Sequence, residues 1–220
     1  MILAIDSTGM TAAAAIVDDG IVVAEFSVCF KRTHSQTLMP IIDRLFLTTG
    51  IKPGEMEFIA CSTGPGSYTG IRIGLATAKG LALGLGKKII PVPTLDAMAY
   101  NVFESSRRIV PIMDARKSQV YTAFYERQGC ELTRVSDYMA LSVSELSELL
   151  NGVPSLFLGD GVQAYRSDLT REEFSFAKEG QNLQRASSVG ALAIDILKKN
   201  ADAAVDASEA VPFYLRRTYC

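Results

Sequence analysis

Residues 59–86 constrain the fold of this chain more than any other stretch, because they combine a short apolar run, a turn and a long glycine-rich segment. The run 59–61 is typical of a buried strand, and the glycines and proline at 64–66 predict a turn. Small residues then recur at every fourth position, on one side of a predicted helix: Gly70, Gly74, Ala78, Ala82 and Gly86. Each glycine inside a helix costs about 1 kcal/mol relative to alanine, so close packing must compensate.

Two interpretations of this small-residue stripe follow from the residues alone. The stripe either packs closely on the chain's own sheet or forms a surface for a partner, and helix propensity does not separate the two. The turn at 64–67 has an alternative role of its own, because glycines and backbone N–H groups at a helix N-terminus can hold a phosphate.

The composition excludes several classes of protein. With 220 residues, of which 48% are hydrophobic, the chain is long enough for a full core and is not intrinsically disordered. Its formal net charge of −2 argues against a chain that grips nucleic acid by itself. The four cysteines have no CxxC spacing, and no apolar run is long enough to span a membrane. We therefore expect a cytoplasmic protein without a disulfide framework.

The order of predicted elements is the same in the two halves of the chain. Residues 2–104 give three strands, a helix, a strand, a helix, a strand and a helix. Residues 108–199 give the same series, with strands expected at 118–126 and 130–138. This repetition predicts a duplicated α/β unit in which helices flank mixed sheets.

The boundary between the two lobes is expected at the short polar segment 104–107. This gives an N-terminal lobe at 1–104 and a C-terminal lobe at 105–200. The tail, from about 200 to 220, has no clear period and could pack back on the first lobe.

Two further helices bear on the argument. Residues 35–48 place apolar side chains at helical spacing, which predicts an amphipathic helix that stops by Gly50. The last helix, 187–199, is expected to be capped by Ser187 or Ser188.

Polar residues at predicted strand ends suggest a nucleotide site. Asp6, Ser7 and Thr8 follow the first strand, and Gly159 and Asp160 end a strand of the second half. Such loops can contact phosphate or magnesium, and they converge in a cleft between duplicated halves. The plain alternative is that glycine and aspartate simply end strands, as they commonly do. A nucleotide-binding ATPase or small-molecule kinase is therefore one hypothesis for function.

Other catalytic patterns find little support. His34 is the single histidine, so neither a His–His metal pair nor a second-histidine relay can form within the chain. Ser67 lies in G-P-G-S-Y-T-G and not in a G-x-S-x-G elbow. The P-loop motif is not matched, because Gly86-Lys87 is followed by lysine and not by serine or threonine.

Six segments together resemble the bacterial TsaB (YeaZ) family, and the resemblance covers nearly the whole chain. They are IDST, HSQTLMP, STGPGSYTGIRIGLATAKGLA, PVPTLDAMA, MDARKSQVY and VPFYLR. The family is similar to TsaD, the enzyme that completes N6-threonylcarbamoyladenosine at position 37 of tRNAs reading ANN codons. Both belong to the ribonuclease-H-like actin, sugar kinase and Hsp70 fold group, which agrees with the duplicated pattern.

The resemblance implies a heterodimer with TsaD and a larger complex with the ATPase TsaE. It implies a non-catalytic subunit with no cofactor and no metal, which contacts tRNA only indirectly and is not a protease. The isolated chain could form a homodimer. TsaD-like enzymes carry a His-x-x-x-His metal pair on the helix that matches 34–48, and here His34 is followed four residues later by Leu38.

The family's partner surface uses the two helices that match 34–48 and 67–86, which favours the partner interpretation of the stripe. The residues expected there are Leu38, Ile41, Ile42, Leu45, Gly70, Ile71, Gly74, Ala78 and Ala82. Two helices that meet two equivalent helices can serve a homodimer or a pseudo-symmetric heterodimer. A peptidase is a third hypothesis, motivated only by the TsaD-like ancestry.

Overall fold

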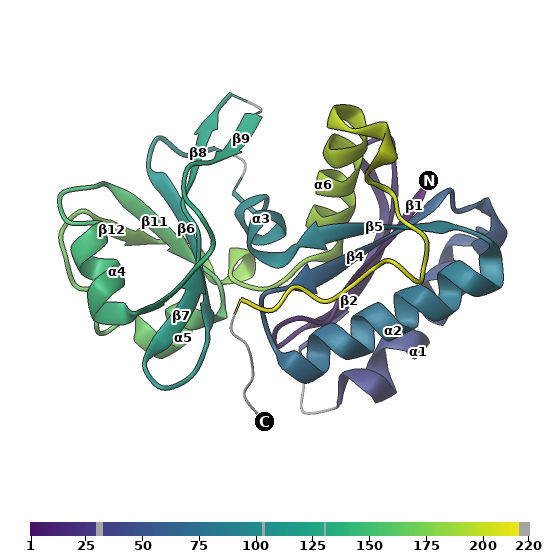
Figure 1. Ribbon diagram of the computed structural model, residues 1–220, viewed down its shortest axis with the longest axis horizontal. Helices are drawn as coiled ribbons and strands as arrows, with labels where there is room; N and C mark the ends of the chain where they lie inside the picture. Colours follow the sequence, from purple (N-terminus) through teal and green to yellow (C-terminus); the bar gives the residue numbers. More distant parts are fainter. Residues whose placement is uncertain (30–32, 103, 130, 216–220) are drawn as a thin grey trace. The chain divides into compact units, whose positions relative to one another are not determined.

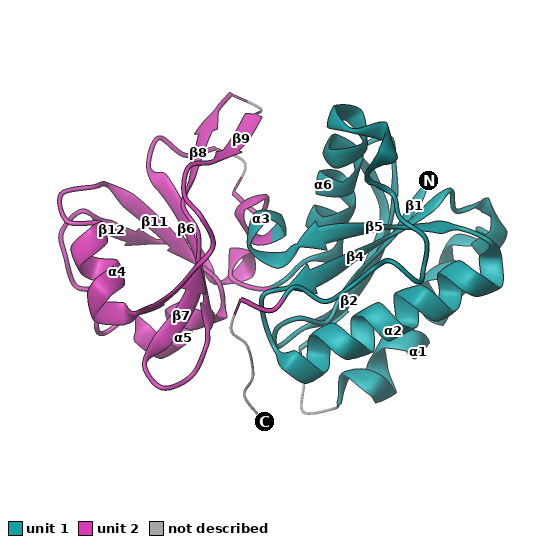
Figure 2. Cartoon of the chain, in the orientation of Figure 1, with its two compact units in different colours: residues 1–97, 184–213 teal, residues 98–183, 214–220 magenta. Residues whose placement is uncertain are grey.

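A computed structural model describes residues 1–29, 33–102, 104–129 and 131–215. The chain divides into two compact units, which Figure 2 shows in different colours. Unit 1 contains residues 1–97 and 184–213, and unit 2 contains residues 98–183 together with 214 and 215. Each unit has its own sheet and its own hydrophobic core.

The sheet of unit 1 has the strand order β3-β2-β1-β4-β5. Its strands are β1 (Ile2–Asp6), β2 (Ala12–Asp18), β3 (Ile21–Val28), β4 (Phe58–Gly64) and β5 (Lys88–Pro93). β1 pairs antiparallel with β2 and parallel with β4, and β4 pairs parallel with β5. The carboxyl ends of β1, β4 and β5 therefore meet at one edge of the sheet, and their amino ends meet at the other.

Two helices cover one face of this sheet (Figure 1). α1 (His34–Thr49) and α2 (Tyr68–Leu85) bury their apolar sides in one cluster with Leu3, Ile5 and Ile16 of the strands.

Shorter elements of the chain are η1 (Pro53–Glu55), α3 (Thr94–Ala99), η2 (Glu179–Gln181) and η3 (Ala201–Ala203). The helix expected at 94–104 is thus confirmed in place but is shorter.

The last long helix, α6 (Ala186–Lys199), covers the opposite face of the same sheet (Figure 1). Because α6 packs on this sheet, it belongs to unit 1, whereas the lobes expected from the sequence, 1–104 and 105–200, place it in the second lobe. Close packing is the reason, since a Cβ added at Gly190 would lie 2.5 Å from Cγ2 of Val17. Residues 200–213 of the tail also belong to unit 1, where Val205 forms an antiparallel bridge with Ile89 of β5.

α6 is capped from a distance. Its first residue is Ala186, and no side chain of the preceding residue Arg185 caps it. Instead, the Glu25 carboxylate of β3 accepts hydrogen bonds from the backbone N–H and the hydroxyl of Ser187, both at 2.9 Å. Its other oxygen accepts from Nη2 of Arg185 at 2.8 Å. The expected serine cap was therefore wrong in mechanism, because Ser187 is a donor to Glu25.

Unit 2 repeats the topology of unit 1 with one insertion. Its strands are β6 (Arg108–Asp114), β7 (Gln119–Thr122), β8 (Tyr125–Gln128), β9 (Glu131–Arg134), β10 (Met139–Ser142), β11 (Ser155–Leu158) and β12 (Phe174–Phe176). The order β10-β7-β6-β11-β12 has the same sequence of antiparallel and parallel pairings as β3-β2-β1-β4-β5. The inserted hairpin β8–β9 pairs with the start of β6. The duplicated α/β fold is thus confirmed.

The strand expected at 118–126 is broken in the structure, and the strand expected at 130–138 is shorter, since β9 ends at Arg134. β7 ends at Thr122 because the chain then turns, and the N–H of Phe124 donates to the hydroxyl of Ser136 at 2.8 Å. Residue 130 lies outside the described residues. The helices of this unit are α4 (Val143–Leu149) and α5 (Asp160–Tyr165). The capping box that opens α4, Ser142 with Glu145, is confirmed.

Candidate functional site

The carboxyl end of β1 carries a buried carboxylate. Asp6 is 1% exposed, and its Oδ1 accepts hydrogen bonds from the backbone N–H and the hydroxyl of Thr8, both at 2.8 Å. Its Oδ2 accepts from the hydroxyl of Ser62, at the end of β4, at 2.6 Å. Burial raises the pKa of Asp6, and these hydrogen bonds oppose the rise. Asp6 therefore ties the ends of two neighbouring parallel strands together.

The loop after Asp6 packs against the start of α2. The hydroxyl of Ser7 donates to the carbonyl of Gly70 at 2.8 Å, and the carbonyl of Thr8 accepts from the N–H of Ser67 at 2.7 Å. A Cβ added at Gly70 would collide with the carbonyl oxygen of Ser7, and one added at Gly74 would lie 2.5 Å from its hydroxyl. These two glycines are thus required by a contact within the chain itself.

All nine residues expected at a partner surface are buried inside unit 1. Their side chains, or the backbone in the case of the glycines, lie in the layer between the helices and the sheet: Leu38, Ile41, Ile42, Leu45, Gly70, Ile71, Gly74, Ala78 and Ala82. From Gly70 to Ala82 the stripe therefore packs inside the chain's own unit, as in the first of the two interpretations, whereas Gly86 is exposed. Whether these helices also contact a partner is a separate question about their outer sides.

The outer sides of the same helices carry exposed apolar and small residues. We call this surface the α1–α2 outer face, and it consists of Met39, Leu47, Ala76, Gly80, Leu83 and Gly84. Leu47 is 70% exposed and Leu83 is 75% exposed. A Cβ added at Gly80 or Gly84 would meet no atom within 4 Å, so no packing within the described chain calls for glycine at either position.

Sequence reasoning overlooked this outer face, although a signal was present. Ala76, Gly80 and Gly84 also recur every fourth residue, two positions out of phase with the inner stripe. Two residues turn an α-helix by about 200°, so the second series lies on the opposite side. α2 therefore carries two small-residue stripes, one buried and one open.

His34 acts on the same loop as Asp6. Its Nε2 lies 2.9 Å from the carbonyl oxygen of Gly9, and because a carbonyl only accepts, Nε2 is the donor. One turn further along α1, Leu38 is buried in the core. Among the residues that the structure describes, no group of three or more His, Cys, Asp or Glu side chains is placed to hold a metal ion.

Unit 2 carries two carboxyl groups at the matching place. Asp114 ends β6 and Asp160 follows β11, and these strands are parallel neighbours. The N–H of Asp114 donates to Oδ1 of Asp160 at 3.2 Å, and the hydroxyl of Tyr165 donates to Oδ1 of Asp114 at 2.7 Å. Burial raises the pKa of Asp160 to about 6, and the charge of Asp114 adds to the rise.

The five residues predicted to bind a nucleotide fall into two groups. Asp6, Ser7 and Thr8 belong to unit 1, and Gly159 and Asp160 belong to unit 2. In the first group, both Asp6 oxygens already accept hydrogen bonds from the chain. In the second, the N–H of Gly159 donates to the side chain of Asn182 at 3.2 Å. Nucleotide binding stays a prediction.

No helix in the described ranges is long and apolar enough to cross a bilayer.

Comparison with known proteins gives a consistent result. Residues 28–216 match the family model described as TsaD, tRNA N6-adenosine threonylcarbamoyltransferase. The chain is 33% identical to the tRNA threonylcarbamoyladenosine biosynthesis protein TsaB of Bacillus subtilis (strain 168), over 98% of this chain and 93% of that protein. It is 32% identical to the protein of the same name from Escherichia coli (strain K12), over 98% and 94% of the two chains.

Solved structures show the same fold. YeaZ from Pseudomonas aeruginosa matches with a TM-score of 0.84 at 24% identity, over 97% of this chain and 99% of that one. A second structure, described as an uncharacterized protein with similarity to peptidase YEAZ from Pseudomonas aeruginosa, matches with a TM-score of 0.83 at 23% identity, over 98% and 99%.

Proposed function

Because the chain belongs to the TsaB family of tRNA threonylcarbamoyladenosine biosynthesis proteins, we propose that it is the non-catalytic subunit that binds and activates TsaD. The reaction served is the formation of N6-threonylcarbamoyladenosine at position 37 of tRNAs reading ANN codons. The observation that carries the proposal is the α1–α2 outer face, where the exposed Leu47 and Leu83 lie on the same helices as two glycines that no packing within the described chain requires.

A non-catalytic role is supported by what the polar groups of unit 1 already do. His34 donates to the carbonyl of Gly9, and the position one turn on holds the buried Leu38 in place of a second imidazole. Both carboxylate oxygens of Asp6 accept hydrogen bonds, from Thr8 and from Ser62. These groups stabilise the loop between β1 and β2, and none of them presents an open ligand set for a metal.

A docking role is supported by the residues of the α1–α2 outer face, because in the free chain they lower helix stability and leave apolar side chains in water. Each of Gly80 and Gly84 lowers helix stability by about 1 kcal/mol relative to alanine. Leu47 and Leu83 expose side chains whose burial would each contribute roughly 1.5–3 kcal/mol. Glycine at an exposed helix position lets a second helix approach closely, which fits a partner that itself presents helices. The nine buried residues named from the sequence would then hold this face in place from beneath.

The same face suits a pseudo-symmetric pair of subunits. We propose that it also serves a second copy of the chain when TsaD is absent, and that TsaE joins after TsaD is bound. A slightly acidic subunit is a poor primary tRNA ligand, so tRNA contacts fall mainly to the partner.

The test is the affinity of the chain for purified TsaD, measured by isothermal titration calorimetry. Leu83→Lys should weaken binding by about tenfold or more, because it places a charge in the centre of the proposed contact. Leu149→Lys is the matched control, since Leu149 is also an exposed helical leucine, at 55%, but lies in unit 2. Equal affinities for wild type and Leu83→Lys would remove this face from the contact.

A second candidate, a nucleotide-binding ATPase or small-molecule kinase, is favoured by one observation: the exposed carboxylate of Asp114 lies at a strand end near Asp160, and the hydrogen bonds that it accepts from described residues reach only its Oδ1. Calorimetry with ATP and Mg²⁺ on the isolated chain separates the two candidates. Tight binding with turnover would support the enzyme, and its absence would support the docking subunit.

A further inference from the structure

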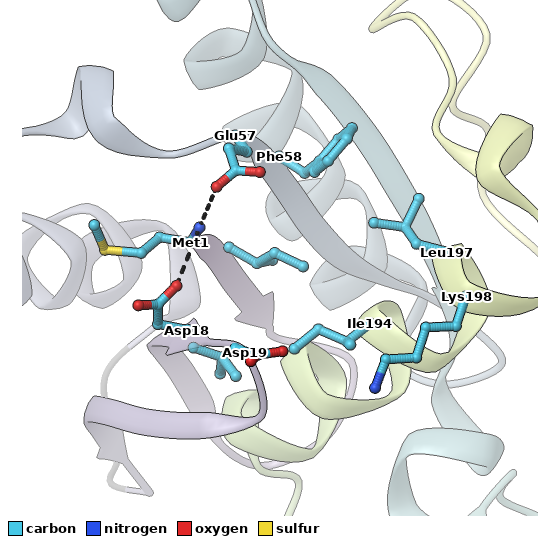
Figure 3. Close-up of a pocket in the computed structure, with 10 residues that line it drawn as sticks. Met1, Asp18, Asp19, Glu57, Phe58, Ile194, Leu197 and Lys198 are labelled. Atoms are coloured by element: carbon cyan, nitrogen blue, oxygen red, sulfur yellow. Dashed lines mark hydrogen bonds and ion pairs between the residues drawn. The ribbon is translucent and has the colours of Figure 1, made fainter.

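A hollow of about 370 Å³ lies in unit 1 at the sheet edge opposite the Asp6 loop. It is formed at the amino ends of β1 and β4, at the turn between β2 and β3, and beside the last turns of α6 (Figure 3). The lining residues are Met1, Ile2, Val17, Asp18, Asp19, Glu57, Phe58, Ile194, Leu197 and Lys198. Ligand pockets run from roughly 300 to 1,000 Å³, so this one suits a small molecule.

The hollow has an apolar side. Ile2 and Val17 belong to the buried cluster between the sheet and α6, and Phe58, Ile194 and Leu197 are partly buried against that cluster. Figure 3 shows Phe58, Leu197 and Ile194 together on one side of the hollow. An aliphatic or aromatic group placed there would bury its surface against them, at about 25 cal/mol per Å².

The rim carries both signs of charge, and part of it is already neutralised. The α-ammonium group of Met1 lies 2.7 Å from Oε1 of Glu57 and 3.5 Å from Oδ1 of Asp18. Asp19 and Lys198 differ from these three groups, because within the described ranges no ion pair engages either of them. The Asp19 carboxylate, on the β2–β3 turn, and the Lys198 ammonium group, on α6, can therefore pair with the charges of a ligand.

We propose that this hollow binds a small zwitterion with an apolar body, the class to which the apolar α-amino acids belong. The ligand's ammonium group would pair with Asp19, its carboxylate with Lys198, and its side chain would cover Ile194, Leu197 and Phe58. A ligand with one charge would leave one of the two rim groups unused. A ligand without the apolar part would leave the apolar side in water.

This site is independent of the proposed function. It lies on the α6 side of the sheet, whereas the α1–α2 outer face belongs to the helices on the other side. Loss of one interaction therefore predicts no loss of the other, and the two proposals can fail separately.

The experiment is an NMR titration of the isoleucine and leucine methyl groups with L-leucine. We expect saturable shifts at Ile194 and Leu197 with a dissociation constant on the order of 1 mM, because the charged contacts are exposed to water. L-Serine, 3-methylbutylamine and 4-methylpentanoate, which lack the apolar body, the carboxylate and the amine respectively, should each bind at least about threefold more weakly.

The variants Asp19→Asn and Lys198→Gln should each weaken L-leucine binding about threefold. Lys199→Gln is the matched control, because Lys199 is the next residue of α6 and does not line the hollow. Affinity for TsaD should be unchanged in all three. No saturable shift up to about 20 mM L-leucine, or equal binding of the amine alone, would overturn the proposal.

Discussion

The ends of β1 and β6 occupy the same place in the two halves of the fold, yet their carboxylates differ. Each strand has an antiparallel neighbour on one side and a parallel neighbour on the other. Asp6, at the end of β1, is buried and accepts hydrogen bonds from Thr8 and Ser62. Asp114, at the end of β6, also accepts a hydrogen bond from the N–H two residues on, that of Arg116, but it is exposed and its own N–H donates to a second carboxyl group, that of Asp160.

The difference shows that topology places a carboxylate but its neighbours decide its role. At the end of β4 in unit 1, Ser62 supplies a hydroxyl that satisfies Asp6. After β11 in unit 2, Asp160 supplies a second acid, and burial, with a smaller contribution from the charge of Asp114, raises the pKa of Asp160 to about 6. Both carboxylates hold the loop that follows their strand, but only Asp6 is buried beneath hydroxyl donors, and only Asp114 has a second acid beside it.

The largest effect is expected for Asp6→Ala. The variant leaves buried Thr8 and Ser62 donors without an acceptor, and it should lower the free energy of unfolding by about 3 kcal/mol or more. Asp114→Ala, at the equivalent but exposed position, should cost about 1 kcal/mol or less. Urea unfolding measures both values. Similar losses of unfolding free energy in the two variants would show that the two carboxylates do not differ in their contribution to stability.

Gly70→Ala and Gly80→Ala compare the inner and outer stripes of α2. A methyl group at Gly70 collides with the Ser7 carbonyl, so this variant should lose about 2 kcal/mol. The methyl group at Gly80 meets open space and improves helix propensity, so that variant should gain up to about 1 kcal/mol. Thermal unfolding measures both. A gain at Gly70 would show that the stripe does not pack on the Ser7 loop.

Asp160→Asn tests the acid pair of unit 2. The pKa of Asp160 is higher in the folded chain than its usual value of 3.8, so the folded state binds the proton more tightly and loses stability as pH rises from about 4 to about 6. Asparagine keeps the acceptor for the Asp114 N–H and carries no charge. The stability of the variant relative to wild type should therefore rise by about 2 kcal/mol between about pH 4 and pH 7.

Urea unfolding at a series of pH values gives this difference, and ¹³C NMR of the carboxyl groups gives the pKa directly. A relative stability that does not change with pH would mean that Asp160 titrates normally.

The smallest effect is expected for Glu25→Ala. Glu25 accepts from the N–H and hydroxyl of Ser187 and so caps α6, and its loss should cost about 1 kcal/mol. Glu172→Ala is the control, because Glu172 is exposed, and it should change stability by less than about 0.5 kcal/mol. Chemical unfolding compares the two. Identical unfolding curves for the two variants would show that Glu25 does not stabilise α6 as its cap.

The sequence predicted the order of elements and the duplicated topology, because hydrophobic periodicity and turn residues act locally. The capping box at Ser142 and the stop of α1 at Gly50 are of this kind. The cap of α6 could not be found in this way, since its acceptor, Glu25, is 162 residues from Ser187. Contacts of that kind depend on which strand lies beside which helix.

The two helices of the proposed docking surface could be named from the sequence, but which of their residues are exposed could not. A stripe every fourth residue identifies one side of α2 but does not say which side faces the sheet. Gly70 and Gly74 face inward because the Ser7 loop lies against them. Gly80 and Gly84 face outward, and only the packed structure separates the two series.

The most direct test of the docking account is hydrogen–deuterium exchange of the chain, alone and in complex with TsaD. We predict slower exchange in peptides from α1 and α2, with α6 and unit 2 unchanged. A stable complex that protects α6 or unit 2, and leaves α1 and α2 exchanging as in the free chain, would contradict it.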